Sequence, residues 1–228
     1  MKAMILAAGR GERMRPLTDT TPKVLLKVGG RALIEYHIEA LKAAGVVDIV
    51  VNLAWLGEQI VDYLGDGGHL GVKIVYSDEG VAALETGGGI FRALKVLGDE
   101  PFWVVNGDTH TSFTYSQPQP AGDSLAHLIL VPNPEHNPGG DFVLAGDRVQ
   151  NSGGAAYTYS GIGVFSAGLF MGQTDGVFPL APLLRKAADD NCLTGELFEG
   201  LWSDVGTPER LKEVDKLIGK SSAGTMRR

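Results

Sequence analysis

The sequence predicts an α/β fold with a doubly wound, mostly parallel mixed sheet flanked by helices. In the first half, short apolar runs that suit buried strands alternate with segments of helical periodicity, which is typical of parallel sheets. In the second half, strand-like runs and a hairpin signal dominate, so the sheet is expected to be mixed. The chain has 228 residues, of which 44% are hydrophobic and 21% charged. This composition is that of a globular protein with a substantial core.

The first half contains four predicted buried strands, at residues 2–8, 48–53, 72–77 and 101–106. Helical spacing predicts helices between them, at residues 33–44, 57–64 and 90–97, and Gly45 fits the end of the first helix. Ligands of such sheets bind outside the carboxyl ends of the strands. The segments that follow these ends, including residues 9–23, Asn52 and residues 106–108, are therefore expected at one site.

The second half is expected to contain more strands than helices. Strands are predicted at residues 127–131, 142–144, 148–150, 157–165 and 196–202, with a helix at 180–188 and a last helix capped by Thr207. No linker divides the chain, so we expect one domain over residues 1–219, made of two halves, 1–110 and 111–219. Residues 220–228 are polar and are expected to form a frayed tail.

Charge and cysteine content exclude several classes of protein. The formal net charge is −7 and the sequence pI is about 5.2, which argues against a nucleic-acid partner. Cys192 stands alone, so no internal disulfide links the chain to an oxidising compartment. The apolar run at the N-terminus is too short for a signal peptide or a membrane span. We therefore expect a cytoplasmic protein with no membrane partner.

The long segment after the first strand has the chemistry of a phosphate site. Gly9 and Gly11 allow backbone N–H groups to approach phosphate oxygens closely. Four cations lie on the same segment, where they suit a triphosphate and a departing pyrophosphate: Arg10, Arg13, Arg15 and Lys23.

Other phosphate motifs fit this segment less well. A dinucleotide fold requires a third glycine where Met14 stands, and Pro16 follows too soon for a helix to open there. A P-loop requires Gly-Lys-Ser/Thr, which is absent. A solvated basic loop is the remaining alternative.

Asp108 and Asp204 form the second group of candidate residues. Each is expected to end an apolar strand, so that both project from the same rim of the sheet. Two neighbouring carboxylates repel one another unless a cation lies between them, and their hard oxygen ligands suit Mg²⁺. An aspartate that ends a strand can also simply cap a turn.

The motif Gly9-x-Gly11-x-Arg13-x-x-Pro16-Leu17-Thr18, followed by Pro22-Lys23, resembles the signature of sugar-1-phosphate nucleotidyltransferases. The resemblance continues in order through residues 34–37, 85–89, 106–108 and 202–207. It implies a Rossmann-like, GT-A-like fold without a C-terminal β-helix. Residues 1–110 would then bind the nucleotide and residues 111–219 the sugar.

The resemblance also implies a role for individual residues. Catalytic roles fall to Arg13, which would contact the outgoing phosphates, to Lys23 at the reacting centre, and to Asp108. Asp108 and Asp204 would hold Mg²⁺. Nucleotide contacts are implied for Leu6, Ala7, Ala8, Gly9, Gly11, Arg13, Lys23, Asn52, Gly88 and Asn106.

The acceptor region resembles that of N-acetylmuramate-1-phosphate uridylyltransferases, in the motifs Asn133-Pro134-x-His136 and Gly140-Asp141-Phe142. This implies that UTP and N-acetylmuramate 1-phosphate react to give UDP-N-acetylmuramate and pyrophosphate in peptidoglycan recycling. The residues implied to bind the sugar are Glu85, Gly140, Asp141, Ser160 and Gly161, although turn formation explains Gly140 and Asp141 as well.

Other readings remain open at this point. The same chemistry could use mannose 1-phosphate with GTP, or glucose 1-phosphate with dTTP or UTP. A sugar-nucleotide sensor is the alternative that is not an enzyme, and the chain is expected to be a monomer or a small homo-oligomer. His110 is a further candidate for a ligand or metal contact, whereas His37 and Trp103 are expected to pack in the core.

Overall fold

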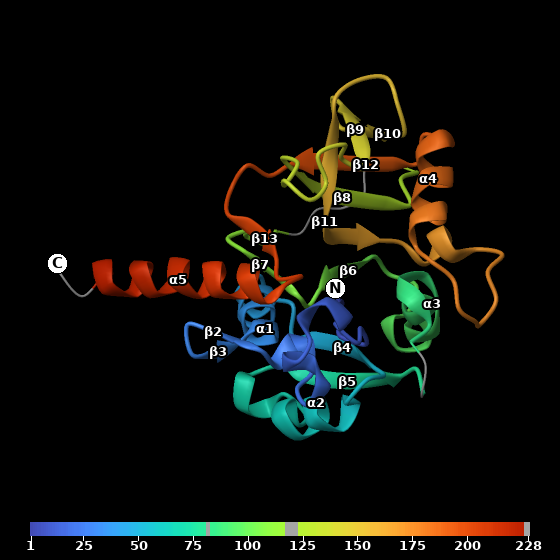
Figure 1. The fold of residues 1–228 in the computed structure, drawn as a ribbon. Coiled ribbons are helices and arrows are strands. Elements are labelled where there is room, and N and C mark those ends of the chain that lie inside the picture. Colours follow the sequence, from blue (N-terminus) through green and yellow to red (C-terminus); the bar gives the residue numbers. More distant parts are fainter. Residues whose placement is uncertain (81–82, 117–122, 226–228) are drawn as a thin grey trace.

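The computed structural model describes residues 1–80, 83–116 and 123–225, in which helices flank a mixed sheet (Figure 1). The helices are α1 (Leu33–Ala43), α2 (Gly57–Leu64), α3 (Glu85–Leu97), α4 (Ala181–Asp189) and α5 (Pro208–Thr225). The strands of the main sheet are β1 (Ala3–Leu6), β4 (Asp48–Leu53), β5 (Lys73–Asp78), β6 (Phe102–Asn106), β8 (Ala126–Val131), β9 (Phe142–Ala145), β10 (Arg148–Gln150), β11 (Ala156–Phe165) and β12 (Leu193–Leu197). Two small sheets pair β2 (Lys27–Val28) with β3 (Arg31–Ala32) and β7 (Thr109–Thr111) with β13 (Trp202–Asp204).

The main sheet has nine strands in the order β5-β4-β1-β6-β11-β8-β12-β10-β9, and β11 also pairs with β9. The pairs β5–β4, β4–β1, β1–β6 and β12–β8 are parallel, and the remaining pairs are antiparallel. The parallel end comes from the first half of the chain and the mixed end from the second half. The predicted α/β class and the mixed sheet are thus confirmed.

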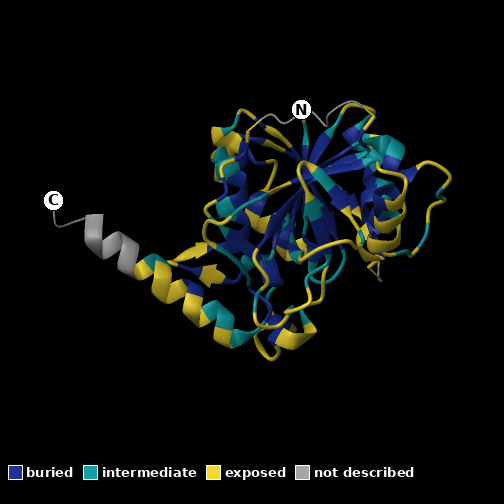
Figure 2. Ribbon diagram, turned by 90° about the horizontal axis from the view of Figure 1, so that it is seen from above, coloured by how far each residue is buried: buried dark blue, intermediate teal, exposed yellow. Residues whose placement is uncertain are grey.

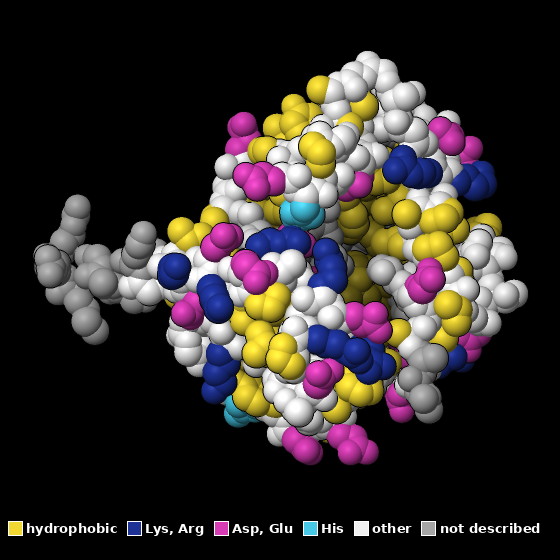
Figure 3. Space-filling model, viewed as in Figure 1, with side chains coloured by type: hydrophobic (Ala, Val, Ile, Leu, Met, Phe, Trp, Pro, Cys, Tyr) yellow, Lys and Arg dark blue, Asp and Glu magenta, His cyan; other side chains and the backbone are white. Residues whose placement is uncertain are grey.

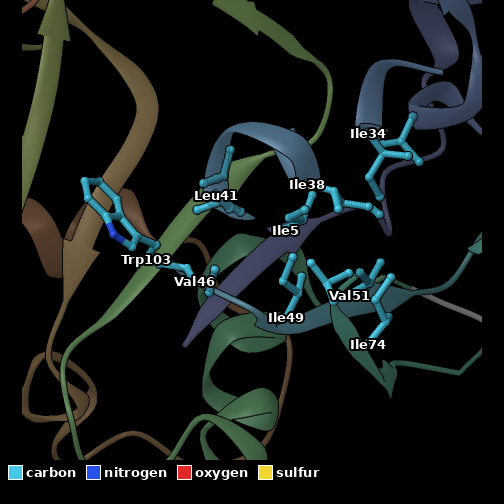
Figure 4. Packing of buried hydrophobic residues seen from close by; sticks show 14 of the residues in the cluster. Ile5, Ile34, Ile38, Leu41, Val46, Ile49, Val51, Ile74 and Trp103 are labelled. Carbon is cyan, nitrogen blue, oxygen red and sulfur yellow. The ribbon is translucent and has the colours of Figure 1, made fainter. Parts of the chain in front are cut away.

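Alternate side chains of the parallel strands enter two different cores, because successive residues of a strand point to opposite faces. Ile5 and Val51 pack with residues of α1 and α2 (Figure 4). Met4, which precedes Ile5 on β1, and Val104 of β6 pack with residues of α3 and α4 on the other face of the sheet. Buried residues are accordingly concentrated along the sheet (Figure 2).

The expected turn after α1 is confirmed. Gly45 has a φ of 80°, and its N–H donates to the carbonyl of Lys42. That left-handed conformation is accessible to glycine at little cost. It reverses the chain so that Val46 enters the core beside β4.

One predicted strand is wrong, because residues 196–202 do not form a single strand. β12 ends at Leu197, and the chain leaves the main sheet through Glu199 and Gly200. Residues 202–204 then pair with β7 instead. The indole N–H of Trp202 donates to the carbonyl of Ser160 on β11 at 3.0 Å, and this bond holds β13 beside the main sheet.

The last helix, α5, begins where Thr207 predicts, since the hydroxyl of Thr207 accepts from the N–H of Arg210 at 3.4 Å. It projects from the body of the molecule (Figure 1) and continues to Thr225, so the frayed tail expected from residue 220 onward is wrong as far as that residue, and residues 226–228 lie outside the described ranges. Near its middle, Val214 is buried against the β2–β3 region, and the carboxylate of Asp215 accepts from the N–H of Gly29 at 2.8 Å. No helix in the described ranges is both long enough and apolar enough to cross a membrane.

His37 is a core residue, as the sequence predicts. Its side chain is buried, with Nε2 2.8 Å from the carbonyl oxygen of Thr109 and Nδ1 3.4 Å from the hydroxyl of Tyr115. Burial lowers the pKa of His37 to about 4, although the bond to Thr109 and the charge of Asp108 oppose that shift. The folded protein therefore holds His37 neutral under conditions in which an unfolded chain would protonate it.

This depressed pKa predicts a loss of stability in mild acid. The contribution is fully present above the unfolded pKa of about 6.5 and is lost as the pH falls toward 4, because only the unfolded chain takes up the proton. Between pH 7.5 and 5 the free energy of unfolding should fall by about 2 kcal/mol from this group. Urea unfolding of wild type and His37→Gln across that range tests the prediction. Parallel pH profiles would contradict it, since the other histidines are present in both proteins.

Candidate active site

A pocket of about 220 Å³ lies at the carboxyl ends of β1, β4 and β6. We call it the nucleotide pocket. It brings together most of the residues predicted to contact a nucleotide. It is lined by Leu6, Ala7, Ala8, Gly9, Lys23, Val24, Asn52, Glu79, Ala83, Glu85, Thr86, Asn106 and Asp108.

A buried chain of hydrogen bonds shapes this pocket. The N–H of Ala7 donates to Oδ1 of Asn52 at 2.7 Å, and Nδ2 of Asn52 donates to Oε1 of Glu79 at 2.6 Å. The other carboxylate oxygen of Glu79 accepts from the N–H of Leu84 at 2.6 Å. Segments that follow β1, β4 and β5 are thereby tied to the start of α3. Glu79 was not among the predicted site residues, although it directly follows the carboxyl end of β5.

The start of α3 differs from the prediction. The helix begins at Glu85 rather than near Ile90, so the glycines of residues 87–89 lie inside it. A Cβ on Gly88 would overlap the carbonyl oxygen of Gly176. Gly88 therefore packs against the loop before α4 and does not line the nucleotide pocket. Glu85 does line it, with a φ of 59° that residues other than glycine rarely adopt.

A second pocket, of about 270 Å³, adjoins the first and shares Gly9, Lys23 and Asp108 with it. We call it the phosphate pocket. Its other lining residues include Gly11 and Arg13. Both were predicted to contact phosphates.

The four cations of the phosphate segment separate into two pairs with different surroundings. The guanidinium carbon of Arg10 lies 4.3 Å from the centroid of the Trp55 ring. Nε of Arg15 lies 3.0 Å from Oδ1 of Asp19, with which it forms an ion pair. Arg13 and Lys23 instead line the phosphate pocket. The high density of cations in the sequence thus reduces to two that face the site.

Asp108 and Asp204 are neighbours, but not for the reason that the sequence suggests. Asp204 lies on β13 in a small separate sheet and not at the rim of the main sheet. There it pairs with Thr109, and the N–H of Val205 donates to the carbonyl of Asp108 at 2.9 Å. The two aspartates therefore meet through β7 and β13.

Each of these carboxylates has a cationic partner. Lys23 contacts Asp108, and Arg210 contacts Asp204. His136 lies 3.2 Å from Asp204 as well. Arg210 was not among the predicted site residues, because it stands in the first turn of the helix that Thr207 caps.

The donor set fits a hard divalent cation. The side chains of Asp108 and Asp204 are 34% and 21% exposed, so both can meet a ligand from solvent. Among the described residues no group of three or more His, Cys, Asp or Glu side chains could hold a metal. Mg²⁺ does not require such a group, because it is usually bound by one or two carboxylates together with water and substrate phosphates.

A third pocket, of about 300 Å³, shares Leu6, Thr86 and Asn106 with the nucleotide pocket. We call it the acceptor pocket. Its wall is largely apolar and includes Asp141, which was predicted to bind a sugar. The hollow between the two halves of the molecule, with hydrophobic side chains along its wall, is visible in Figure 3.

Three other predicted sugar residues do not line these pockets. Gly140 lies against the backbone of Ala156, and its φ is 66°. Gly161, with a φ of 79°, lies so close to Asn106 that a Cβ would overlap that side chain. Ser160 is buried, and its hydroxyl accepts from the N–H of Ile162 at 3.1 Å. Of the three, Gly161 lies against a residue that lines the pockets, Asn106.

His110 does not line the three pockets either. Its ring meets Tyr36 edge to face, with 5.0 Å between the ring centroids. Nδ1 is buried and has no protein partner in the described part of the chain. Burial lowers the pKa of His110, which favours the neutral ring. The structure therefore does not bring His110 into contact with a ligand in these pockets.

Comparison with known proteins agrees with this geometry. Residues 2–137 match the model of the family described as nucleotidyl transferase. An N-acetylmuramate alpha-1-phosphate uridylyltransferase from Neisseria meningitidis serogroup B is 52% identical over 96% of this chain and 99% of its own. A protein of the same name from Caulobacter vibrioides is 36% identical over 91% of this chain and 92% of its own.

The fold is also found among solved structures. The inositol-1-phosphate CTP transferase from T. maritima superposes with a TM-score of 0.74, covering 96% of this chain and 95% of its own at 20% identity. At that identity the likeness concerns the fold alone. The match over residues 2–137 and the two relatives show that this chain belongs to the nucleotidyl transferase family.

Proposed function

We propose that this protein is a Mg²⁺-dependent uridylyltransferase that joins UTP to N-acetylmuramate 1-phosphate and releases pyrophosphate. The observation that carries the proposal is the position of Lys23 and Asp108, which line both the nucleotide pocket and the phosphate pocket. The choice of substrates rests on the two relatives described above, whose names give this activity.

The nucleotide pocket suits a uridine that is held largely by backbone groups. Its walls come from the segment that follows β1 and from the start of α3, which Asn52 and Glu79 tie together. From there a triphosphate can extend toward Arg13 and Lys23 in the phosphate pocket. The acceptor pocket opens on the other side of Leu6 and Asn106, where a sugar would lie.

This arrangement supports a direct transfer. An oxygen of the sugar phosphate attacks the α-phosphorus in line, the bond to the β-phosphate oxygen breaks, and pyrophosphate leaves on the opposite side. Lys23 and Arg13 offset the negative charge that develops on the phosphates. Asp108 and Asp204 would hold Mg²⁺, which supplies further positive charge beside the phosphoryl oxygens.

The proposed reaction belongs to the recovery of cell-wall sugars, because it returns free N-acetylmuramate 1-phosphate to its UDP-linked form. We place it in the cytoplasm, in a monomer or small homo-oligomer. Within one domain over residues 1–219, residues 1–110 bind the nucleotide and residues 111–219 bind the sugar.

A matrix of nucleoside triphosphates and sugar 1-phosphates tests the proposal, with pyrophosphate release as the readout and with Mg²⁺ present or chelated. We expect turnover with UTP and N-acetylmuramate 1-phosphate that depends on Mg²⁺. Preference for another pair would overturn the proposed substrates but keep the reaction. No turnover with any pair, while UTP still binds, would favour a sensor.

Substitutions at the reacting centre should stop the chemistry without unfolding the protein. Asp108→Asn and Lys23→Met should each lower kcat at least about 100-fold, because the first removes a carboxylate that would hold Mg²⁺ and the second a positive charge that faces the phosphates. Arg15→Gln is the matched control, because Arg15 lies on the same segment but pairs with Asp19. Thermal unfolding verifies the fold of all three variants. Turnover near that of wild type in either of the first two would contradict the assigned roles.

The hydrogen-bonded chain behind the nucleotide pocket predicts a different kinetic effect. Glu79→Ala leaves the amide of Asn52 and the N–H of Leu84 without their acceptor, so the pocket wall loses its fixed shape. We expect the KM for UTP to rise about tenfold, with a smaller change in the KM for the sugar phosphate. Asp78→Asn is the control, since it also removes one negative charge, but from the exposed residue next to Glu79. Destabilisation with an unchanged KM for UTP would show that Glu79 acts on the fold alone.

A further inference from the structure

The acceptor pocket contains one positively charged residue among those that line it, Arg185 of α4. Most of the wall around it is apolar, with contributions from Phe142, Leu180 and Leu184. A charge at the edge of an apolar wall is unusual in a pocket for a neutral sugar, whose hydroxyls require hydrogen bonds rather than a counterion. Neither the chemistry of transfer nor the uridine pocket requires Arg185.

The guanidinium of Arg185 is held in place. It stacks on the ring of Phe142, 5.2 Å from the ring centroid. Nη1 donates to Oδ1 of Asn151 at 3.3 Å and to the carbonyl of Asp141 at 3.4 Å. Asn151 is itself fixed, because its Nδ2 donates to the carbonyl of Arg185 at 2.8 Å and to the carboxylate of Asp189 at 2.7 Å. This support orients the planar fork before any ligand binds.

Arg185 nevertheless keeps both its charge and its spare donors. An arginine has five N–H donors, and the bonds to Asn151 and Asp141 use only those of Nη1. The carboxylate of Asp141 is directed elsewhere, because Oδ2 accepts from the N–H of Tyr159 at 2.8 Å and Oδ1 accepts from Asn137 at 3.3 Å. Over the described ranges no carboxylate forms an ion pair with Arg185.

The position of this charge matches one feature of the proposed acceptor. N-acetylmuramate carries a lactyl ether with a methyl group and a carboxylate, which N-acetylglucosamine lacks. A planar guanidinium binds a carboxylate through two parallel hydrogen bonds, and the apolar wall suits the methyl group. Because the acceptor pocket adjoins the nucleotide pocket through Leu6, Thr86 and Asn106, a sugar there lies beside the reacting centre.

We infer that Arg185 binds the lactyl carboxylate of the acceptor and so selects N-acetylmuramate 1-phosphate over N-acetylhexosamine 1-phosphates without that group. The inference rests on the proposed function. It gives Arg185 a role in specificity and none in the transfer itself. Phe142 and Asn151 then act as positioning residues, since they touch the guanidinium rather than the reacting atoms.

The test compares two acceptors, N-acetylmuramate 1-phosphate and N-acetylglucosamine 1-phosphate, at saturating UTP and Mg²⁺. In Arg185→Gln the ratio of the two kcat/KM values should fall about 10- to 100-fold, mainly through a higher KM for the muramate acceptor. Arg185→Lys should recover part of the ratio, because it keeps the charge but not the fork. Lys186→Gln is the matched control, since it removes one positive charge from the next position of α4, where Lys186 pairs with Asp190.

The outcomes separate this inference from the proposed function. If the wild-type protein does not turn over N-acetylmuramate 1-phosphate, the proposed function is overturned and the inference with it. If the wild-type protein prefers that acceptor and Arg185→Gln keeps the same ratio, only the inference is overturned. An equal loss with both acceptors would also overturn it, because that result describes a general effect on the pocket.

Discussion

The buried hydrogen bonds that join Ala7, Asn52 and Glu79 are the constraint on which the site depends. Parallel strands end in backbone groups and polar side chains that have no further strand to pair with, and burying them unpaired would be costly. Here the amide of Asn52 links the segment after β1 to the carboxylate that follows β5, and that carboxylate also fixes the start of α3. One polar chain thus satisfies the strand ends and forms the back of the nucleotide pocket.

Charge is distributed around this pocket in a way that the net charge of −7 does not reveal. Arg10 lies 3.9 Å from the carboxylate of Glu12 and Arg15 pairs with Asp19, so a carboxylate accompanies each of these charges. Lys23 and Arg210 each meet a carboxylate, Asp108 and Asp204 respectively. When a triphosphate and a divalent cation bind together, the phosphates can take the place of the carboxylates beside Lys23 and Arg210. The cation can then take the place of these side chains beside Asp108 and Asp204. Lys23 and Arg210 therefore compensate the two carboxylates of the site.

Local patterns in the sequence were sufficient to predict the four strands that the first half contributes to the main sheet, since each is a short apolar run, but not the short pair β2 and β3. Contacts between distant segments could not be predicted in this way. The run at residues 196–204 divides into β12 and β13 because its last part pairs with β7, far away in sequence. The family resemblance implied that Gly161 binds a sugar, but only the fold shows that the side chain of Asn106 lies against it. Glu79 and Arg185 escaped notice for the same reason, as their partners are set by packing.

In the proposed function, the two halves of the sheet bind different substrates. The nucleotide and phosphate pockets are built chiefly from residues 6–108, whose backbone and cations suit any nucleoside triphosphate with the right base. Most of the residues that line the acceptor pocket lie on or next to β9, β11 and α4, in the second half of the chain. A change of acceptor can therefore arise from substitutions on these elements without disturbing Lys23 or Asp108. A charged residue such as Arg185, supported by its neighbours but not neutralised by them, is the kind of feature by which one enzyme of such a family would differ from another.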